Sequence, residues 1–194
     1  MSTIVVVKKN KYAAIGADTM TTLGATLESA EYIENHSKIN KAGPNYFAST
    51  GHASFGLVLD SYFSKNKVRD SLKGPQEIFE FARTLHSTLK EDYFLNPQED
   101  SDDPFESSRL DCLIANPHGI FGLYSLRSVQ QYSKFYAFGS GYKFALGAMR
   151  AVYDSELSAE SIARIGLEAA ADFDDATGLP LEIKTIKLAS GNSR

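Results

Sequence analysis

Apolar residues begin almost at the first position of this chain. Residues 4–7 are an uninterrupted β-branched run, which is typical of a buried strand. A polar turn at residues 9–11 separates this run from a second apolar stretch, so the sequence predicts two strands, Ile4–Lys8 and Tyr12–Ala17, joined as a hairpin. The first residues of a chain are usually frayed unless something ties them down, so a buried strand at this point is unusual.

Later segments alternate between the period of strands and the period of helices. Short strands are predicted at residues 38–41, 46–49, 110–115, 120–124, 134–138 and 182–188, and residues 19–37 predict a loop with at most a short strand. Helical spacing predicts a first pair of helices, one at residues 55–62 and one from Pro75 to Asn96 whose apolar stripe includes Phe79 and Tyr93. A second pair is predicted at residues 144–152 and 158–173.

The order of these elements predicts the fold class. Strand blocks alternate with helix pairs, and tight turns join most of the strands, which argues against a doubly wound parallel sheet. We therefore predict an α+β fold, a four-layer αββα sandwich of two antiparallel sheets flanked by helices. A chain of 194 residues is expected to form one domain, spanning residues 1–194, with a sizeable core.

Composition excludes several classes of function. The formal net charge is −4, which gives no electrostatic footprint for nucleic acid. No apolar run is long enough for a membrane span, and the short apolar start lacks the preceding basic residues of a signal peptide, so we expect a cytoplasmic protein. The lone Cys112 lies in an apolar run, where a small core residue is expected rather than a nucleophile. Residues 98–108 are acidic without a basic residue, which favours a solvated loop over a cation site.

The candidate chemistry begins at Ser2. Removal of Met1 would place a hydroxyl and a free α-amine on one residue, and such an amine can take the proton from the side chain beside it. The alternative is an ordinary buried first strand in which Ser2 and Thr3 are incidental hydroxyls. Because successive side chains of a strand point to opposite faces, only one of the two can face a cleft.

Residues that could assist Ser2 fall at the ends of predicted strands. Asp18 closes the second strand, Lys38 opens the third, and Gly51 follows the fourth at the start of a helix, whose free N–H groups suit an oxyanion. Gly139-Ser140-Gly141, and Asp174 with Thr177, end later elements. Each has an ordinary explanation as a turn, a cap or a surface charge when it is taken alone.

Together these stretches resemble the β-type subunit of proteasomes and the related bacterial proteasome-like peptidases, which are N-terminal-nucleophile hydrolases with the four-layer sandwich predicted above. The resemblance runs from Met1 to about Leu188. The matching stretches are Ser2-Thr3-Ile4-Val5-Val6-Val7, Gly16-Ala17-Asp18, Ser37-Lys38-Ile39, Ser49-Thr50-Gly51, Phe138-Gly139-Ser140-Gly141 and Asp174-Asp175-Ala176-Thr177-Gly178.

The resemblance implies a role for each matching position. Ser2 stands where the family has its catalytic threonine, and Gly51 matches the glycine of the oxyanion hole. Asp18 and Lys38 match the acid and lysine beside the nucleophile. Ser140 and Asp174 match the residues that hold the terminal amine, and Thr177 falls where the family usually has a catalytic-site serine. Ser49 lies at the floor of the pocket for the residue before the scissile bond, with Ala53 beside it.

Three departures from the family pattern affect these assignments. The nucleophile is serine, which lacks the methyl group that restricts the rotamer of threonine. Thr177 replaces the usual serine and keeps its hydroxyl. The segment between Asp18 and Lys38 is longer than usual, so Lys38 is assigned from Ser37-Lys38-Ile39, with Lys41 as the alternative.

The function implied by the resemblance is a serine- or threonine-type endopeptidase subunit that acts through Ser2 once Met1 is removed. It implies no metal or organic cofactor, a peptide or unfolded-protein substrate, self-association into stacked rings, a possible ATPase regulator, and neither nucleic acid nor membrane as a partner. Two alternatives stay open, a catalytically silent structural ring subunit and an N-terminal-nucleophile amidase that acts on a small amide.

Overall fold

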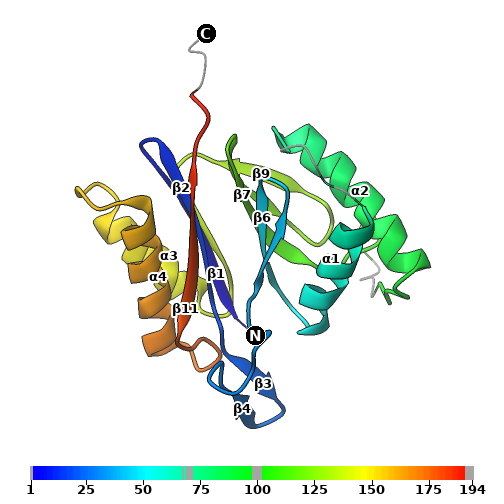
Figure 1. Ribbon diagram of the computed structural model, residues 1–194, viewed down its shortest axis with the longest axis horizontal. Helices are drawn as coiled ribbons and strands as arrows, with labels where there is room; N and C mark the ends of the chain where they lie inside the picture. The colour runs from blue at the N-terminus through cyan, green and yellow to red at the C-terminus, as the bar shows by residue number, and fades with distance from the viewer. Residues whose placement is uncertain (1, 67, 69–71, 98–101, 191–194) are drawn as a thin grey trace.

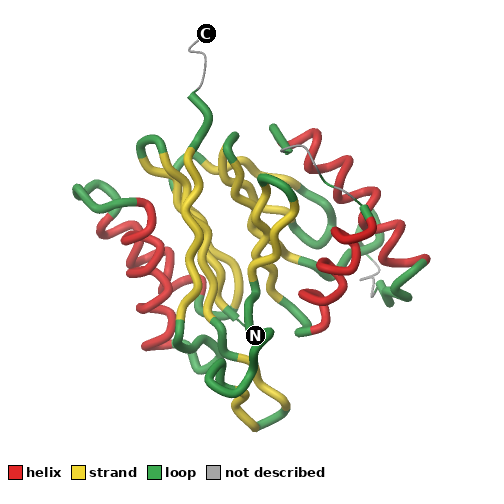
Figure 2. The backbone as a smooth tube through the Cα atoms, viewed as in Figure 1, coloured by secondary structure: helices red, strands yellow, loops and turns green. Residues whose placement is uncertain are grey.

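The structure is a computed structural model that describes residues 2–66, 68, 72–97 and 102–190. Two β-sheets lie face to face, and a pair of helices covers the outer face of each sheet (Figure 1). Helices α3 and α4 cover one sheet, and α1 and α2 cover the other, as the tube view also shows (Figure 2). The predicted α+β fold, an αββα sandwich of two antiparallel sheets, is confirmed.

The first sheet has the strand order β10-β1-β2-β11, and all of its neighbours are antiparallel. The predicted N-terminal hairpin forms its centre, which explains why a buried strand can begin the chain: both sides of β1 are paired. The strands are β1 (Thr3–Lys9), β2 (Tyr12–Asp18), β10 (Phe135–Gly139) and β11 (Leu181–Lys187).

The second sheet is a meander with the order β5-β6-β7-β8-β9, again fully antiparallel. Its strands are β5 (Ile39–Ala42), β6 (Asn45–Thr50), β7 (Asp111–Asn116), β8 (Gly119–Leu123) and β9 (Val129–Tyr132). A separate two-stranded hairpin, β3 (Thr21–Leu23) with β4 (Thr26–Glu28), projects beside the N-terminus (Figure 1).

The helices are α1 (Ser54–Lys65), α2 (Pro75–Glu91), α3 (Tyr142–Val152) and α4 (Ala159–Phe173).

Side-chain alternation in β1 assigns its residues to two different cores. Ile4 and Val6 pack between the sheets, whereas Val5 and Val7 pack against α3 and α4. A third core lies between α1, α2 and the second sheet, so three apolar interfaces join the four layers.

Four details differ from the sequence-based expectations. Strand β9 was not predicted, and the loop expected at residues 19–37 contains the hairpin β3–β4. Helix α2 ends at Glu91, so Tyr93 lies beyond it, where it still packs on the same core. Phe79 was assigned to the apolar stripe of α2 but is 38% exposed.

No helix within the described ranges is long and apolar enough to cross a bilayer.

Antiparallel pairing brings the candidate residues to one end of the sandwich. Thr3 at the start of β1 pairs with Gly139 at the end of β10, and Asp18 at the end of β2 pairs with the first residue of β11. In the second sheet, β5 begins and β6 ends at a common edge, because Ile39 pairs with Ala48. Segments far apart in the sequence therefore meet there.

Candidate active site

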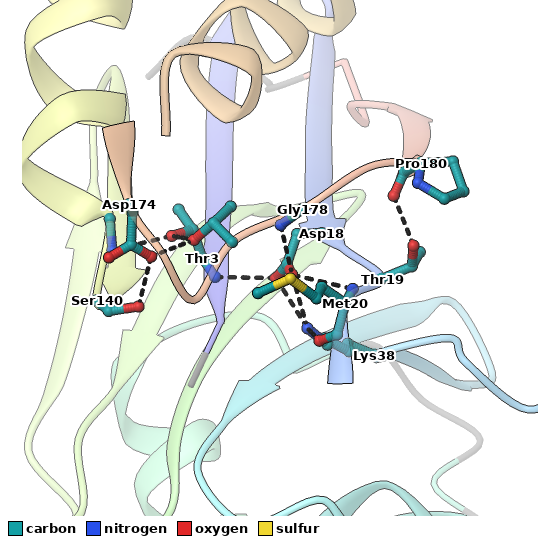
Figure 3. A network of polar contacts seen from close by, with 11 residues as sticks. Thr3, Asp18, Thr19, Met20, Lys38, Ser140, Asp174, Gly178 and Pro180 are labelled. Carbon is teal, nitrogen blue, oxygen red and sulfur yellow. Dashed lines mark hydrogen bonds and ion pairs between the residues drawn. The ribbon is translucent and has the colours of Figure 1, made fainter. Parts of the chain in front are cut away.

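A buried ion pair joins the two sheets at this end of the molecule. Lys38 Nζ lies 2.9 Å from both carboxylate oxygens of Asp18 and donates to the carbonyl oxygen of Met20 at 2.6 Å (Figure 3). The side chain of Asp18 is fully buried, and that of Lys38 is 14% exposed. Lys38, rather than the alternative Lys41, therefore reaches Asp18. The ammonium of Lys41 lies over the ring of Tyr46.

Burial works against both charges of this pair. It lowers the pKa of Lys38, and the Asp18 carboxylate opposes that change. It raises the pKa of Asp18, and Lys38 opposes that change together with backbone donors from Thr3 and Gly178. Each group therefore depends on the other for its ionised form.

The same carboxylate also holds the start of β1. Asp18 Oδ1 accepts from the backbone N–H of Thr3 at 3.0 Å, and Oδ2 accepts from the backbone N–H groups of Met20 and Gly178 at 3.1 and 3.3 Å. Asp18 thus places the Lys38 ammonium beside the first residues of the strand (Figure 3). The amides of Met20 and Gly178 have no sequence signal, because any residue other than proline offers the same backbone donor.

Ser2 itself lies directly before β1 and is 7% exposed. Its carbonyl oxygen accepts from the backbone N–H of Ser140 at 3.0 Å. Gly139 permits this contact: it has φ of +101°, and a Cβ there would lie 1.7 Å from the Ser2 carbonyl oxygen. Met1 lies outside the described residues.

Three of the predicted residues form one hydrogen-bonded cluster around a carboxylate. Asp174 Oδ2 accepts from Ser140 Oγ at 2.7 Å and from Thr177 Oγ1 at 2.5 Å. Ser140 comes from the turn after β10, and the other two follow α4 (Figure 3). Sequence reasoning missed Thr3 as a member of this cluster. Its hydroxyl lies 2.6 Å from Thr177 Oγ1 and accepts from the backbone N–H of Gly141 at 3.0 Å.

Gly51 lies in the turn between β6 and α1, with φ of +126°. It borders a cavity of about 400 Å³ that continues between the start of α1 and the end of α2. The other lining residues are His52, Ser54, Phe55, Val58, Leu89, Tyr93, Leu95 and Arg109. Ser49 and Ala53, the residues predicted for the substrate pocket, do not line this cavity.

The acidic segment shows ordinary ionic contacts where it is described. Glu106 pairs with Lys90 at 2.6 Å and with His86 at 3.2 Å. Glu99 and Asp100 lie outside the described residues. Among the described residues, no group of three or more His, Cys, Asp or Glu side chains could hold a metal ion.

Comparison with solved structures shows close similarity to BPH of Thiobacillus denitrificans, a bacterial proteasome homologue. The two chains are 46% identical with a TM-score of 0.92, over 97% of this chain and 100% of the other. A complex of the same protein with epoxomicin matches at 46% identity, the same coverage and a TM-score of 0.90. No family model and no curated protein matches.

A more distant match is HslV of Trypanosoma brucei, which is 18% identical over 95% of this chain and 99% of that chain. The TM-score of 0.66 shows that the two proteins share a fold. The extent of the match to the Thiobacillus protein shows more than the fold. The chain belongs to the bacterial proteasome homologues, a family of proteasome-like N-terminal-nucleophile hydrolases. This confirms the resemblance found in the sequence and supports a peptidase of the proteasome family.

Proposed function

We propose that this chain is an endopeptidase subunit that hydrolyses peptide bonds through an acyl-enzyme on Ser2, after Met1 has been removed. The observation that carries the proposal is the double role of Asp18, which binds the amide of Thr3 and the ammonium of Lys38 at the same carboxylate. A fixed positive charge beside the start of the strand favours an oxyanion there and eases proton loss from a neighbouring hydroxyl.

The proposed reaction has two steps with one proton carrier. The α-amine of Ser2 takes the proton from Ser2 Oγ as this oxygen attacks the substrate carbonyl, and the backbone N–H of Gly51 stabilises the tetrahedral oxyanion. The amine then gives the proton to the leaving nitrogen as the peptide bond breaks. A water molecule attacks the acyl-enzyme, its proton passes through the amine to Ser2 Oγ, and the carboxylic acid leaves.

The role of the free amine explains why Met1 matters. An N-terminal amine has a pKa of about 7.7–8.0, so part of it is neutral near neutral pH and can act as a base. An amide nitrogen in the same place cannot. The donors and acceptors around Ser140 and Asp174 are suited to orienting such an amine, because Ser140 Oγ gives its proton to Asp174 and so keeps lone pairs for another donor.

The test combines N-terminal mass analysis, intact mass after incubation with epoxomicin, and rates on fluorogenic peptides. We expect an adduct and turnover from protein that begins at Ser2, and neither from Ser2→Ala. Ser64→Ala, which removes an exposed hydroxyl in α1, is the matched control and should keep both. Ser2→Thr should stay active. Full activity in Ser2→Ala, or in protein that retains Met1, would contradict the proposal. Neither adduct nor turnover in protein that begins at Ser2 would also contradict it and would favour a silent ring subunit.

We further propose that the subunit works as one domain in a homo-oligomeric double ring of six or seven copies per ring, which confines the active sites. Sedimentation should then show a large assembly at micromolar concentration, and a monomer alone would contradict it.

Ser49 and Ala53 are small and uncharged, so we expect bulky apolar side chains before the scissile bond to be preferred. A peptide panel cleaved best after arginine or aspartate would refute that specificity.

A further inference from the structure

We infer that Thr3 is a positioning residue for catalysis, an inference that rests on the function proposed above. The residue is fully buried, so its side chain cannot touch a substrate. Its hydroxyl nevertheless contacts both segments that carry the residues assigned to the terminal amine. One segment is the turn at Gly141, and the other contains Thr177, and they are far apart in the sequence.

The contacts of this hydroxyl fix the direction of every hydrogen bond around it. The backbone N–H of Gly141 can only donate, so Thr3 Oγ1 accepts there. Thr177 Oγ1 gives its only proton to the carboxylate of Asp174, which accepts it. Thr177 Oγ1 must therefore accept from Thr3, and the proton of Thr3 is committed to it at 2.6 Å.

The result is a single directed chain that ends on the carboxylate: Gly141 N–H to Thr3 Oγ1, Thr3 to Thr177, and Thr177 to Asp174. Ser140 Oγ donates to the same carboxylate oxygen. Thr3 thus bridges the segment that holds Ser140 and the segment that holds Asp174. Because bonds in such a chain polarise one another, loss of the central hydroxyl affects both segments.

Two features of the packing show that this arrangement is close-fitting. A Cβ at Gly141 would lie 2.6 Å from Thr3 Oγ1 and 3.1 Å from the Cβ of Asp174, so only glycine lets the turn approach both. Thr177 also bears a methyl group that the usual serine lacks, and a β-branched side chain has fewer rotamers. The hydroxyl that receives the proton of Thr3 is therefore held more rigidly than a serine hydroxyl would be.

The experiment compares Thr3→Val, Thr3→Ser and Thr19→Val with unaltered protein that begins at Ser2. Thr3→Val keeps the shape and removes the hydroxyl, whereas Thr3→Ser restores it. Thr19→Val is the matched control, because Thr19 is 2% exposed and its Oγ1 donates to the carbonyl oxygen of Pro180 at 2.7 Å, so this variant also loses one buried hydroxyl hydrogen bond. Peptide kinetics give kcat and KM, and circular dichroism checks that each variant is folded.

For Thr3→Val we expect kcat to fall by about 10- to 100-fold, the range that a small misplacement of reacting groups produces, with KM nearly unchanged. Thr3→Ser and Thr19→Val should keep a kcat close to that of the unaltered protein. A folded Thr3→Val with unaltered kcat overturns the inference, and so does an equal loss in Thr19→Val. If Thr3→Val fails to fold, Thr3→Ala takes its place in the comparison with Thr3→Ser. A lower kcat in folded Thr3→Ala than in Thr3→Ser supports the inference, and equal kcat values in the two variants overturn it. Failure of the proposed function is distinguishable, because the unaltered protein would then show no turnover.

Discussion

Replacement of Asp18 by asparagine is the sharpest perturbation of the site, because it keeps the shape and removes one charge of a buried pair. The two carboxylate oxygens accept from five donor contacts, with the amide of Thr3 on one oxygen and the amides of Met20 and Gly178 on the other, while Lys38 contacts both. In either orientation, the NH₂ group of asparagine faces at least one backbone N–H. Lys38 also loses its counter-charge in a site with little solvent, so it either stays charged without compensation or gives up its proton, and both outcomes cost free energy.

The magnitude follows from these losses. Removal of one partner from a buried ion pair costs about 3–5 kcal/mol of unfolding free energy, because the other charge stays buried without compensation. With a slope of about 2 kcal/mol per M, the urea midpoint should fall by about 1.5–2.5 M. Equilibrium unfolding is compared at one fixed protein concentration, since self-association would shift the apparent stability. Peptidase activity should be lost as well.

Two controls separate this explanation from a general effect of charge removal. Glu80→Gln breaks the ion pair between Glu80, whose side chain is 50% exposed, and Arg83, whose side chain is 65% exposed. This substitution should lower the free energy of unfolding by less than about 0.5 kcal/mol. Asp18→Asn combined with Lys38→Met should unfold at higher urea than Asp18→Asn alone, because the uncompensated charge is gone. The reasoning fails if Asp18→Asn matches the unaltered protein within about 0.5 kcal/mol, or if the double variant is less stable than the single one.

Three further predictions concern residues outside this pair. Gly139→Ala should lose activity and stability, because its Cβ would meet the Ser2 carbonyl oxygen. Gly147→Ala in α3 is the control, because its Cβ would meet open space and alanine should raise the free energy of unfolding by up to about 1 kcal/mol. Equal urea midpoints for the two variants would contradict this. Burial raises the pKa of the Cys112 thiol, so a thiol reagent at pH 8 should modify it only in unfolded protein, and stoichiometric reaction with folded protein would refute the assignment. Hydrogen bonds from Lys90 and His86 lower the pKa of Glu106 below 4.5, so its stabilisation is present above that pH and lost as pH falls through the lowered value. Glu106→Gln should therefore destabilise the protein more in urea unfolding at pH 7 than at pH 3, and an effect that is larger at pH 3 would be inconsistent.

The fold was predictable where burial is regular and not where it is interrupted. The N-terminal hairpin and the helix pairs carry strong periodic signals, and the structure has them. Strand β9 carries none, because its central residues Gln130 and Gln131 are exposed on an edge strand that pairs on one side only. In α2 the apolar period continues to Tyr93, but the helix ends at Glu91 and the chain still packs on the same core.

The candidate site divides in a similar way. Its charged and hydroxyl residues could be proposed because they stand at strand ends in the order of a known family, although each alone is unremarkable. Its backbone donors could not be proposed, since the amides of Met20, Gly178 and Ser140 become specific only through the fold. Thr3 was visible only as a competitor of Ser2, because its partners lie at Gly141 and Thr177, more than a hundred residues away in the sequence.

The peptide unit between Ser2 and Thr3 is held at both of its polar groups. Its carbonyl oxygen accepts from the amide of Ser140, and its N–H donates to Asp18, each at 3.0 Å. The Thr3 side chain faces the helix layer, so alternation directs the Ser2 side chain toward the second sheet, which supplies Lys38 and Gly51. The backbone of the proposed nucleophile is thus oriented before a substrate arrives, and serine in place of threonine leaves only the side-chain rotamer less restricted.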